Sequence, residues 1–387
     1  MKVVMFTHSV VSCWNHGNAH FQRGILRALA ARGHQAVALE PVGGWSRSNL
    51  AEAIGEDPAP GFARRFPDID RIDYRGFEEI EAALDGAGLV LVHEWTDPAL
   101  VRRLGRMRAR GAPFLLLFHD THHRAVSAPE EMAALDLNGY DGVLAFGAVL
   151  AETWRRHGWA DQVHVWHEAA DLTLFKPHPQ IPRSRDLVWI GNWGDGERGA
   201  ELDEFLVEPV RALGLSATVH GVRYPEPARV ALARAGIDQP GWIANADVPE
   251  AFARHRMTIH VPRRFYAREL PGIPTIRMFE ALASGIPLIS APWEDSEGLF
   301  RTGTDYLRVE DDPAMRRAMR AVLDDPAMAR ELARNGRETI LARHGCEHRV
   351  DELFRIVDRM TAGHAHHSGH APHSGHVTSV EAEAVSS

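Results

Sequence analysis

The stretch of the chain from residue 258 to residue 292 gathers side chains that suit the binding of a phosphate-bearing ligand. An apolar run, TIHVP, leads into a polar loop and then into a helix predicted over 276–284. A guanidinium can hold a phosphate through two parallel hydrogen bonds, and it stays charged at any physiological pH. The candidate arginines in this stretch are Arg263, Arg264 and Arg277.

The start of the predicted helix offers a second kind of anion ligand, its backbone N–H groups. Thr275 precedes the first turn and is a good N-cap residue, so the free amides after it should point back toward the loop. Arg277 and Glu280 are three residues apart and share one helix face, where the carboxylate is able to accept hydrogen bonds from ribose hydroxyls. The alternative interpretation is a surface ion pair within the helix, worth ~0.3–0.5 kcal/mol.

A second polar cluster, HDTHHR at 119–124, follows an apolar run in the first half of the chain. His119, Asp120, His122 and His123 are residue types that bind metal ions, as a metal-dependent hydrolase would require. Adjacent residues on one loop do not all turn inward, and no further ligands are evident in the second half. We therefore expect no metal here, and a capped loop with a hydrogen-bonded His is a further alternative.

Two glycine-bearing loops follow predicted strands. The first, SVVSCWNHGNAH at 9–20, places Gly17 and Asn18 near a helix start and has no G-x-G-x-x-G. The second, GDGERG at 194–199, matches that pattern literally. A dinucleotide site also needs an acidic residue at the end of the next strand. Here that strand ends in His220 and Gly221, so the sequence does not favour NAD binding.

Apolar runs alternate with amphipathic segments along the whole chain. Strands are predicted at 2–7, 35–40, 88–95, 113–120, 140–147, 186–193, 216–221, 258–262 and 288–292, and helices at 20–32, 228–235, 276–284, 314–323, 328–342 and 346–360. This alternation is typical of doubly wound α/β domains, which bind ligands beyond the carboxyl ends of their strands. We interpret the pair Asp68 and Asp70, with the polar RIDYRG segment after it, as surface.

Composition excludes several classes of protein. The 387 residues are 45% hydrophobic and 25% charged, with a net charge of −9, which argues against a nucleic-acid partner. Two cysteines imply no disulfide framework. The apolar runs are too short to span a membrane and no signal peptide is evident, so we expect a soluble, cytoplasmic protein. A helix that carries Arg102, Arg103, Arg106, Arg108 and Arg110 gives at most a peripheral membrane contact.

The segment RMFEALASGIP, followed by EGLF and by G-x-D-Y at 303–306, resembles the nucleotide-sugar site of GT-B glycosyltransferases, especially the CgeB-like (spore-maturation-protein-like) group. DLTLFKP resembles the segment where such chains leave the first domain. The resemblance implies an α/β GT-B fold, in which two Rossmann-like doubly wound domains face each other across a cleft. The implied parts are an acceptor domain (1–170), a hinge (171–185), a nucleotide-sugar-binding domain (186–342), a helix returning to the first domain (343–360) and a disordered His-rich tail (361–387).

The resemblance also implies a nucleoside-diphosphate sugar as donor substrate, with no cofactor. It implies that Arg277, helped by the other arginines and the helix-start amides, stabilises the departing diphosphate in place of a divalent metal. His119 or Asp120 would contact a sugar hydroxyl or the acceptor. The further cleft residues implied are Gly17, Asn18, Gly191, Asn192, Arg198, Arg263, Arg264, Gly272, Ile273, Thr275 and Glu280.

The implied reaction is a metal-independent, retaining transfer of a sugar, of the hexosyltransferase kind, to an unknown glycan, lipid or protein acceptor. One feature departs from the pattern. Related retaining enzymes carry E-x7-E, and Gly272 stands where the first Glu should precede Glu280. The alternatives are a non-catalytic sugar- or nucleotide-binding protein of the same fold, a nucleotide-sugar epimerase, and the metal-dependent hydrolase.

Overall fold

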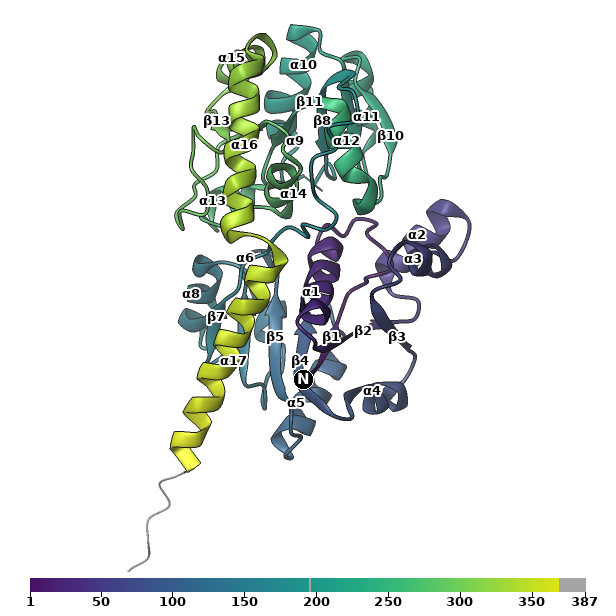
Figure 1. Cartoon of the computed structure of the whole chain (residues 1–387), viewed down its shortest axis with the longest axis vertical. Helices are drawn as coiled ribbons and strands as arrows, with labels where there is room; N and C mark the ends of the chain where they lie inside the picture. Colours follow the sequence, from purple (N-terminus) through teal and green to yellow (C-terminus); the bar gives the residue numbers. More distant parts are fainter. Residues whose placement is uncertain (195, 369–387) are drawn as a thin grey trace, which may run out of the picture.

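The structure, a computed structural model, describes residues 1–194 and 196–368, which form two α/β domains stacked along the long axis of the molecule (Figure 1). The first domain is built on a parallel sheet with the strand order β3-β2-β1-β4-β5-β6-β7. Its strands are β1 (Lys2–Phe6), β2 (Gln35–Pro41), β3 (Asp70–Tyr74), β4 (Ala87–His93), β5 (Leu115–Asp120), β6 (Gly142–Ala145) and β7 (Val163–Val165).

The second domain repeats this design with the strand order β10-β9-β8-β11-β12-β13, again parallel. Its strands are β8 (Arg185–Ile190), β9 (Ala217–His220), β10 (Asp238–Gly241), β11 (His255–His260), β12 (Leu288–Ser290) and β13 (Leu307–Arg308). In both sheets the chain starts in the middle, builds outward, and then returns to the other side of the first strand. The predicted doubly wound α/β fold is therefore confirmed.

Helices cover both faces of the first sheet and bury its Val-, Leu- and Phe-rich strands in two cores. Helix α1 packs on one face, where the last helix of the chain joins it, while α4, α5 and α8 pack on the other. The helices of this domain are α1 (Ala19–Ala31), α2 (Trp45–Ile54), α3 (Ala59–Arg65), α4 (Phe77–Leu84), α5 (Pro98–Ala109), α6 (Arg124–Ser127), α7 (Pro129–Ala133) and α8 (Ala148–His157).

The second sheet is covered in the same way, with α12, α14 and α16 on one face and α10, α11 and α15 on the other. Its helices are α9 (Gly199–Leu202), the π-helix η1 (Asp203–Val207), α10 (Glu208–Leu213), α11 (Glu226–Arg234), the 3₁₀ helix η2 (Asn245–Asp247), α12 (Val248–Arg254), α13 (Arg264–Arg268), α14 (Ile276–Ser284), α15 (Asp312–Asp324) and α16 (Pro326–Arg343).

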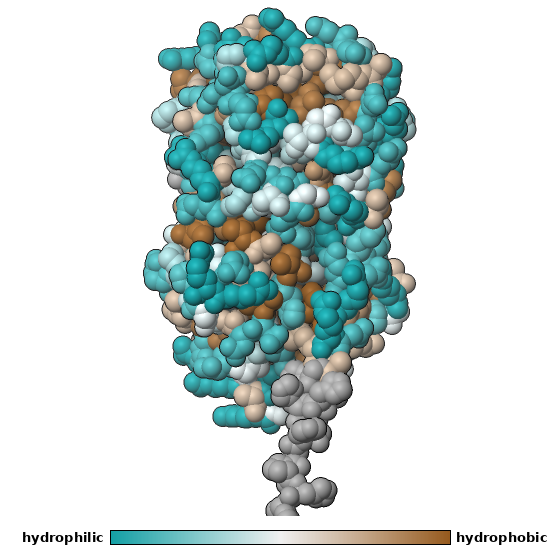
Figure 2. All heavy atoms as spheres, turned by 90° about the vertical axis from the view of Figure 1, so that its left-hand side faces the viewer, coloured by the Kyte–Doolittle hydropathy of each residue, from teal (hydrophilic) through white to brown (hydrophobic). Residues whose placement is uncertain are grey.

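The last helix, α17 (Cys346–Ser368), leaves the second domain and runs down beside the first (Figure 1). It packs against α1, and the Trp166 indole donates a hydrogen bond of 2.8 Å to the Arg349 carbonyl. The helix continues past the predicted boundary at 360, and residues 369–387 of the predicted tail lie outside the described residues. Figure 2 shows this side as mostly hydrophilic, with hydrophobic atoms near the level where the domains meet. None of the described helices is both long and apolar enough to cross a bilayer.

One strand at the edge of the first sheet was not predicted. The polar segment after Asp68 forms the edge strand β3, which pairs in parallel with β2. Strands at an edge tolerate charged side chains, so the segment lacks the apolar run that marks the inner strands. Asp68 and Asp70 are both exposed, which confirms that this pair lies at the surface, and Asp68 forms an ion pair with Arg27 at 2.6 Å.

Candidate functional site

A cavity of about 790 Å³ lies between the two domains. Its walls are the loops that follow β1 and β4 in the first domain, and those that follow β8 and β11 in the second. These pairs of strands are the points where each sheet reverses its winding order, and such points form the ligand crevice of doubly wound folds. The volume lies within the ~300–1,000 Å³ typical of small-molecule sites.

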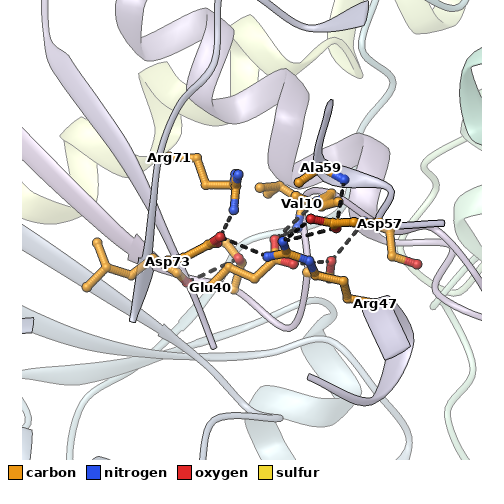
Figure 3. Close-up of polar contacts among 12 residues, drawn as sticks. Val10, Glu40, Arg47, Asp57, Ala59, Arg71 and Asp73 are labelled. Carbon is orange, nitrogen blue, oxygen red and sulfur yellow. Dashed lines mark hydrogen bonds and ion pairs between the residues drawn. The ribbon is translucent and has the colours of Figure 1, made fainter. Parts of the chain in front are cut away.

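The loop after β1 is fixed by a buried carboxylate on β2. Glu40 accepts hydrogen bonds from the Ser9 hydroxyl at 2.7 Å, the Val10 amide at 2.8 Å and the Val11 amide at 3.1 Å. Figure 3 shows Glu40 and Val10 within the surrounding polar network. Three donors satisfy a carboxylate that would otherwise be costly to bury. The loop therefore has a defined shape, and its predicted residues Gly17 and Asn18 line the cavity.

Arg198 is the buried cation of the opposite wall. Its guanidinium donates to the carbonyl oxygens of Val261 at 3.0 Å and Asn192 at 2.6 Å, while its buried Nε has no partner. Burial lowers the pKa of Arg198 to about 9, so the group remains charged near neutral pH. None of the described carboxylates forms an ion pair with it. A buried charge without a counterion is costly, and an anionic ligand in the cavity would supply one.

The glycines of the loop after β8 make room for Arg198. A side chain at Gly191 would approach the Arg198 guanidinium to 3.2 Å, and one at Gly194 would meet Arg198 Cγ at 2.9 Å. Gly194 also has φ = 95°, a conformation that favours glycine. The G-x-G-x-x-G pattern thus positions an arginine in this protein. Asn192 also lines the cavity, and its amide meets the side chain of Asn15 from the first domain.

The start of α14 faces the cavity, which Thr275, Ile276 and Arg277 line. Thr275 occupies the N-cap position, but its side chain makes no capping hydrogen bond, so the predicted cap is wrong in that respect. The first amides of the helix lie beside the cavity, where the positive end of the helix dipole favours an anion.

Glu280 does not line the cavity. Its side chain is fully buried behind Arg277, which donates a hydrogen bond to it, and its Oε1 lies 2.7 Å from Nδ1 of His20 in the first domain. The structure thus brings Arg277 and Glu280 together between the domains. The Arg277 guanidinium faces the cavity, whereas the Glu280 carboxylate lies behind it and does not reach the cavity. The surface ion pair considered above is excluded, because the Glu280 side chain is fully buried and that of Arg277 is only 13% exposed.

Two predicted arginines, Arg263 and Arg264, follow β11 and point in different directions. Arg263 lines the cavity and forms an ion pair with Glu197 at 3.0 Å. Arg264 turns away to Glu201 at 2.7 Å, because α13 begins there and successive helical side chains diverge. Arg264 is therefore not a wall residue.

Gly272 and Ile273 also lie outside the wall. Gly272 has φ = 89°, and a side chain there would come within 2.5 Å of Ser296 Oγ. A glutamate at this position would therefore not fit unless the neighbouring side chains moved. Ile273 is fully buried and packs in the core of the first domain, so it joins the domains rather than meeting a ligand.

The HDTHHR cluster does not converge on one point. His119 is buried against Trp166, and burial lowers its pKa to about 3. Asp120 accepts a hydrogen bond from the Trp154 indole at 2.6 Å, and burial raises its pKa to about 6. Neither lines the cavity, whereas His122 does. His119 and Asp120 are successive residues of β5, so they point into the cores on opposite faces of the sheet. The sequence pattern of a buried strand does not reveal this.

His123 stacks on Phe265 of the second domain at 4.7 Å, away from Asp120. Among residues 1–194 and 196–368, no three His, Cys, Asp or Glu side chains come together in a way that would hold a metal ion. The geometry of the cluster therefore does not support the hydrolase interpretation.

Sequence reasoning missed one buried carboxyl group in the wall. Glu168 lines the cavity just after β7, and burial, with the nearby Glu280 charge, raises its pKa well above the ordinary value. Its environment therefore favours the protonated, neutral form of the carboxyl group. Its position after a parallel strand, in the segment HEAAD, was the available signal.

Two exposed indoles, Trp45 and Trp95, also line the cavity on the side of the first domain. They follow strands β2 and β4 in the sequence, again at the carboxyl edge of the sheet.

With this geometry in view, the chain can be compared with known proteins. Residues 198–355 match a family model described as "Glycosyl transferase-like". The matched segment contains Arg198, the loop after β11 and helix α14. A search of the curated proteins finds no match. The CgeB-like group is not distinguished by these comparisons.

Solved structures of glycosyltransferases share the whole two-domain fold. HepE from Anabaena in complex with UDP and glucose aligns with a TM-score of 0.64 at 14% identity, over 93% of this chain and 100% of that one. A sucrose-phosphate synthase from Thermosynechococcus elongatus gives 0.63 at 17% identity, over 94% and 100%. A glycosyltransferase from Rickettsia africae gives 0.64 at 12% identity, over 93% and 98%. The fold is thus that of GT-B glycosyltransferases.

Proposed function

We propose that the protein transfers a sugar from a nucleoside-diphosphate sugar to an acceptor bound by the first domain. The observation that carries this proposal is the cavity between the domains, where none of the described carboxylates pairs with Arg198 and the first amides of α14 lie beside the cavity. A diphosphate matches both features, since guanidinium groups and helix N-termini are its usual ligands. The glycosyl transferase-like match over 198–355 and the shared fold support the same function.

The donor would lie along the second domain. Its diphosphate would contact Arg198, Arg277 and the first amides of α14, and Arg263 would be available once it releases Glu197. Beyond this point the cavity is lined by His220, Trp242 and Asn245. The His220 Nδ1, Trp242 Nε1 and Asn245 Oδ1 atoms are buried without partners, and a nucleobase edge would supply both donors and acceptors to them. HepE was solved with UDP, so uridine is the base to test first.

We propose that the reaction uses guanidinium charge in place of a metal and retains the configuration at the sugar. The bond from the anomeric carbon to the phosphate oxygen breaks, and a bond to the acceptor oxygen forms on the same face. The acceptor proton passes to the departing phosphate oxygen. Arg198 and Arg277 would stabilise the negative charge that develops on the diphosphate.

The imidazoles of the wall are poor candidates for a general base. Burial lowers the pKa of His8 to about 4 and that of His16 and His122 well below the ordinary value. Such groups stay neutral but bind a proton only weakly, so they can hydrogen-bond a hydroxyl without removing its proton efficiently. This favours the leaving phosphate as the proton acceptor.

The direct test is release of nucleoside diphosphate from UDP-, GDP- and TDP-sugars, measured with and without a glycan mixture as acceptor and with a metal chelator. Release that depends on acceptor and persists with the chelator supports the proposal. Donor binding without any release would favour the non-catalytic alternative. Conversion of the donor sugar without acceptor would instead indicate an epimerase, and activity lost on chelation would contradict metal independence.

A further inference from the structure

A second cavity, of about 570 Å³, adjoins the first on the outer side of the first domain. His8, Pro41 and Trp95 line both cavities, so the two share one wall. The second cavity extends from this wall toward β3, α4 and the start of α5. Its volume also falls within the ~300–1,000 Å³ of small-molecule sites. A ligand long enough to reach past these shared residues would therefore enter the second cavity.

Exposed aromatic rings mark the passage between the cavities. Trp45 and Trp95 are each 47% exposed, and the His8 ring lies between them, 6.2 Å from one indole and 6.4 Å from the other. Indoles combine a large apolar face with a polar N–H, and their exposure at a cavity mouth is typical of binding sites.

Trp45 is also held firmly in place. It begins α2, whose Arg47 donates hydrogen bonds to Asp73 of β3 at 2.9 Å and to Asp57 at 3.2 Å (Figure 3). A ring on a fixed helix loses little conformational entropy when a ligand packs against it.

The second cavity is lined both by aromatic rings and by charged side chains, a guanidinium and a carboxylate among them. The Arg103 guanidinium lies over the Phe77 ring, 3.2 Å from its centre, and none of the described carboxylates pairs with it. Asp97 caps α5 through Oδ1, at 2.9 Å from the Ala99 amide and 3.1 Å from the Leu100 amide.

A pyranose ring needs this combination, because its C–H face packs on an aromatic ring while its hydroxyls bond to guanidinium and carboxylate groups. A lipid chain would need an uninterrupted apolar wall instead. Arg103 and Asp97 interrupt the apolar surface that Phe77 and Leu100 provide.

We propose that the acceptor is an oligosaccharide of two or more residues. Its reacting residue would lie between Trp45 and Trp95 in the first cavity, and the residues beyond it would occupy the second cavity against Phe77 and Arg103. This inference rests on the proposed sugar transfer and adds the class of acceptor to it.

The test is binding of the full-length chain to an array of defined mono- to pentasaccharides in the presence of UDP, with UDP affinity measured separately. Oligosaccharides are expected to bind roughly tenfold or more tightly than monosaccharides. Trp95→Ala should lose binding to all members. Arg103→Ala should lose only the advantage of length. Arg106→Ala is the matched control, since Arg106 is exposed on the same helix and lines neither cavity.

The outcomes separate the two proposals. If the wild-type chain fails to bind UDP and every donor sugar, the proposed function fails. If it binds UDP but retains no glycan, or binds glycans equally at all lengths and in Arg103→Ala, only the acceptor inference is overturned. Binding of phosphatidylglycerol vesicles in place of glycans would also overturn it. Thermal unfolding of each variant checks that folding is intact.

Discussion

Two buried ionisable side chains in the cavity wall decide what this molecule can bind. Among the described residues Arg198 donates to backbone carbonyls alone, so its charge is available to an anion. Burial and the nearby Glu280 raise the pKa of Glu168, which favours its neutral form. A guanidinium that pairs with none of the described carboxylates, in the same wall as a carboxyl group whose neutral form is favoured, suits an anionic ligand such as a diphosphate.

Replacing Glu168 with Gln should change how stability depends on pH. Below about pH 4, both folded and unfolded states carry the proton, and the substitution should have little effect. As pH rises, the unfolded state ionises first because the folded-state pKa is raised, and the wild type loses stability. The Gln variant has no carboxyl group to ionise at this position, so it does not lose this stability as pH rises. Urea unfolding at several pH values should therefore show Glu168→Gln gaining relative stability as pH rises above the ordinary Glu pKa of about 4.3. A pH-independent difference would contradict the raised pKa.

Replacing Glu280 with Ala should weaken UDP binding by ~1–3 kcal/mol, since Arg277 then loses the carboxylate that orients it. Isothermal calorimetry measures the affinity. Glu269→Ala is the control, because Glu269 is exposed on the nearby loop and does not line the cavity. UDP affinity that stays the same in a folded Glu280→Ala chain would remove Glu280 from the donor site.

At the scale of elements, hydrophobic runs predicted the inner strands well, because strands covered on both faces are continuously apolar. Helix α14 was predicted with its observed bounds, since Gly285 ends it in a left-handed conformation. The edge strand β3 was missed because its residues are polar. The sequence also did not show how deeply individual side chains are buried. His119 and Glu280 had suitable types and positions, but packing between elements decides that neither reaches the cavity.

The loop after β8 offers a matched pair of glycine substitutions. Gly194 and Gly196 both have positive φ, at 95° and 87°, so alanine at either should cost ~1 kcal/mol of stability. Only at Gly194 would the new methyl group meet Arg198, because nothing lies within 4 Å of a side chain at Gly196. We expect Gly194→Ala to weaken UDP binding and Gly196→Ala to leave it unchanged, as measured by calorimetry. Equal UDP affinities would show that the loop does not position Arg198.

At the scale of the whole molecule, several contacts hold the domains together around the cavity. Glu297 of the second domain accepts a hydrogen bond from the Ala148 amide at 2.8 Å and lies 2.9 Å from His167 Nε2, both in the first domain. Ile273 packs into the first domain's core. Contacts of this kind set the balance between open and closed arrangements, and closure excludes water from a transfer reaction.

Glu297→Ala removes both polar contacts and should favour a more open arrangement of the domains. We expect a larger radius of gyration in small-angle scattering without ligand, and a return toward the wild-type value with UDP. Glu294→Ala is the control, since Glu294 is exposed on the same loop. A radius of gyration identical to that of the wild type would show that this contact does not hold the domains together.

The central claim is that the counterion of Arg198 is the diphosphate of a sugar nucleotide held between the domains. Calorimetric titration of UDP into the wild type, Arg198→Gln and Arg264→Gln tests it most directly, because Arg264 is a neighbouring arginine turned away from the cavity. A lost charge-assisted hydrogen bond of ~1.5–3 kcal/mol corresponds to roughly ten- to a hundredfold weaker binding by Arg198→Gln, with Arg264→Gln unchanged. Equal UDP affinity in a folded Arg198→Gln chain would contradict the claim.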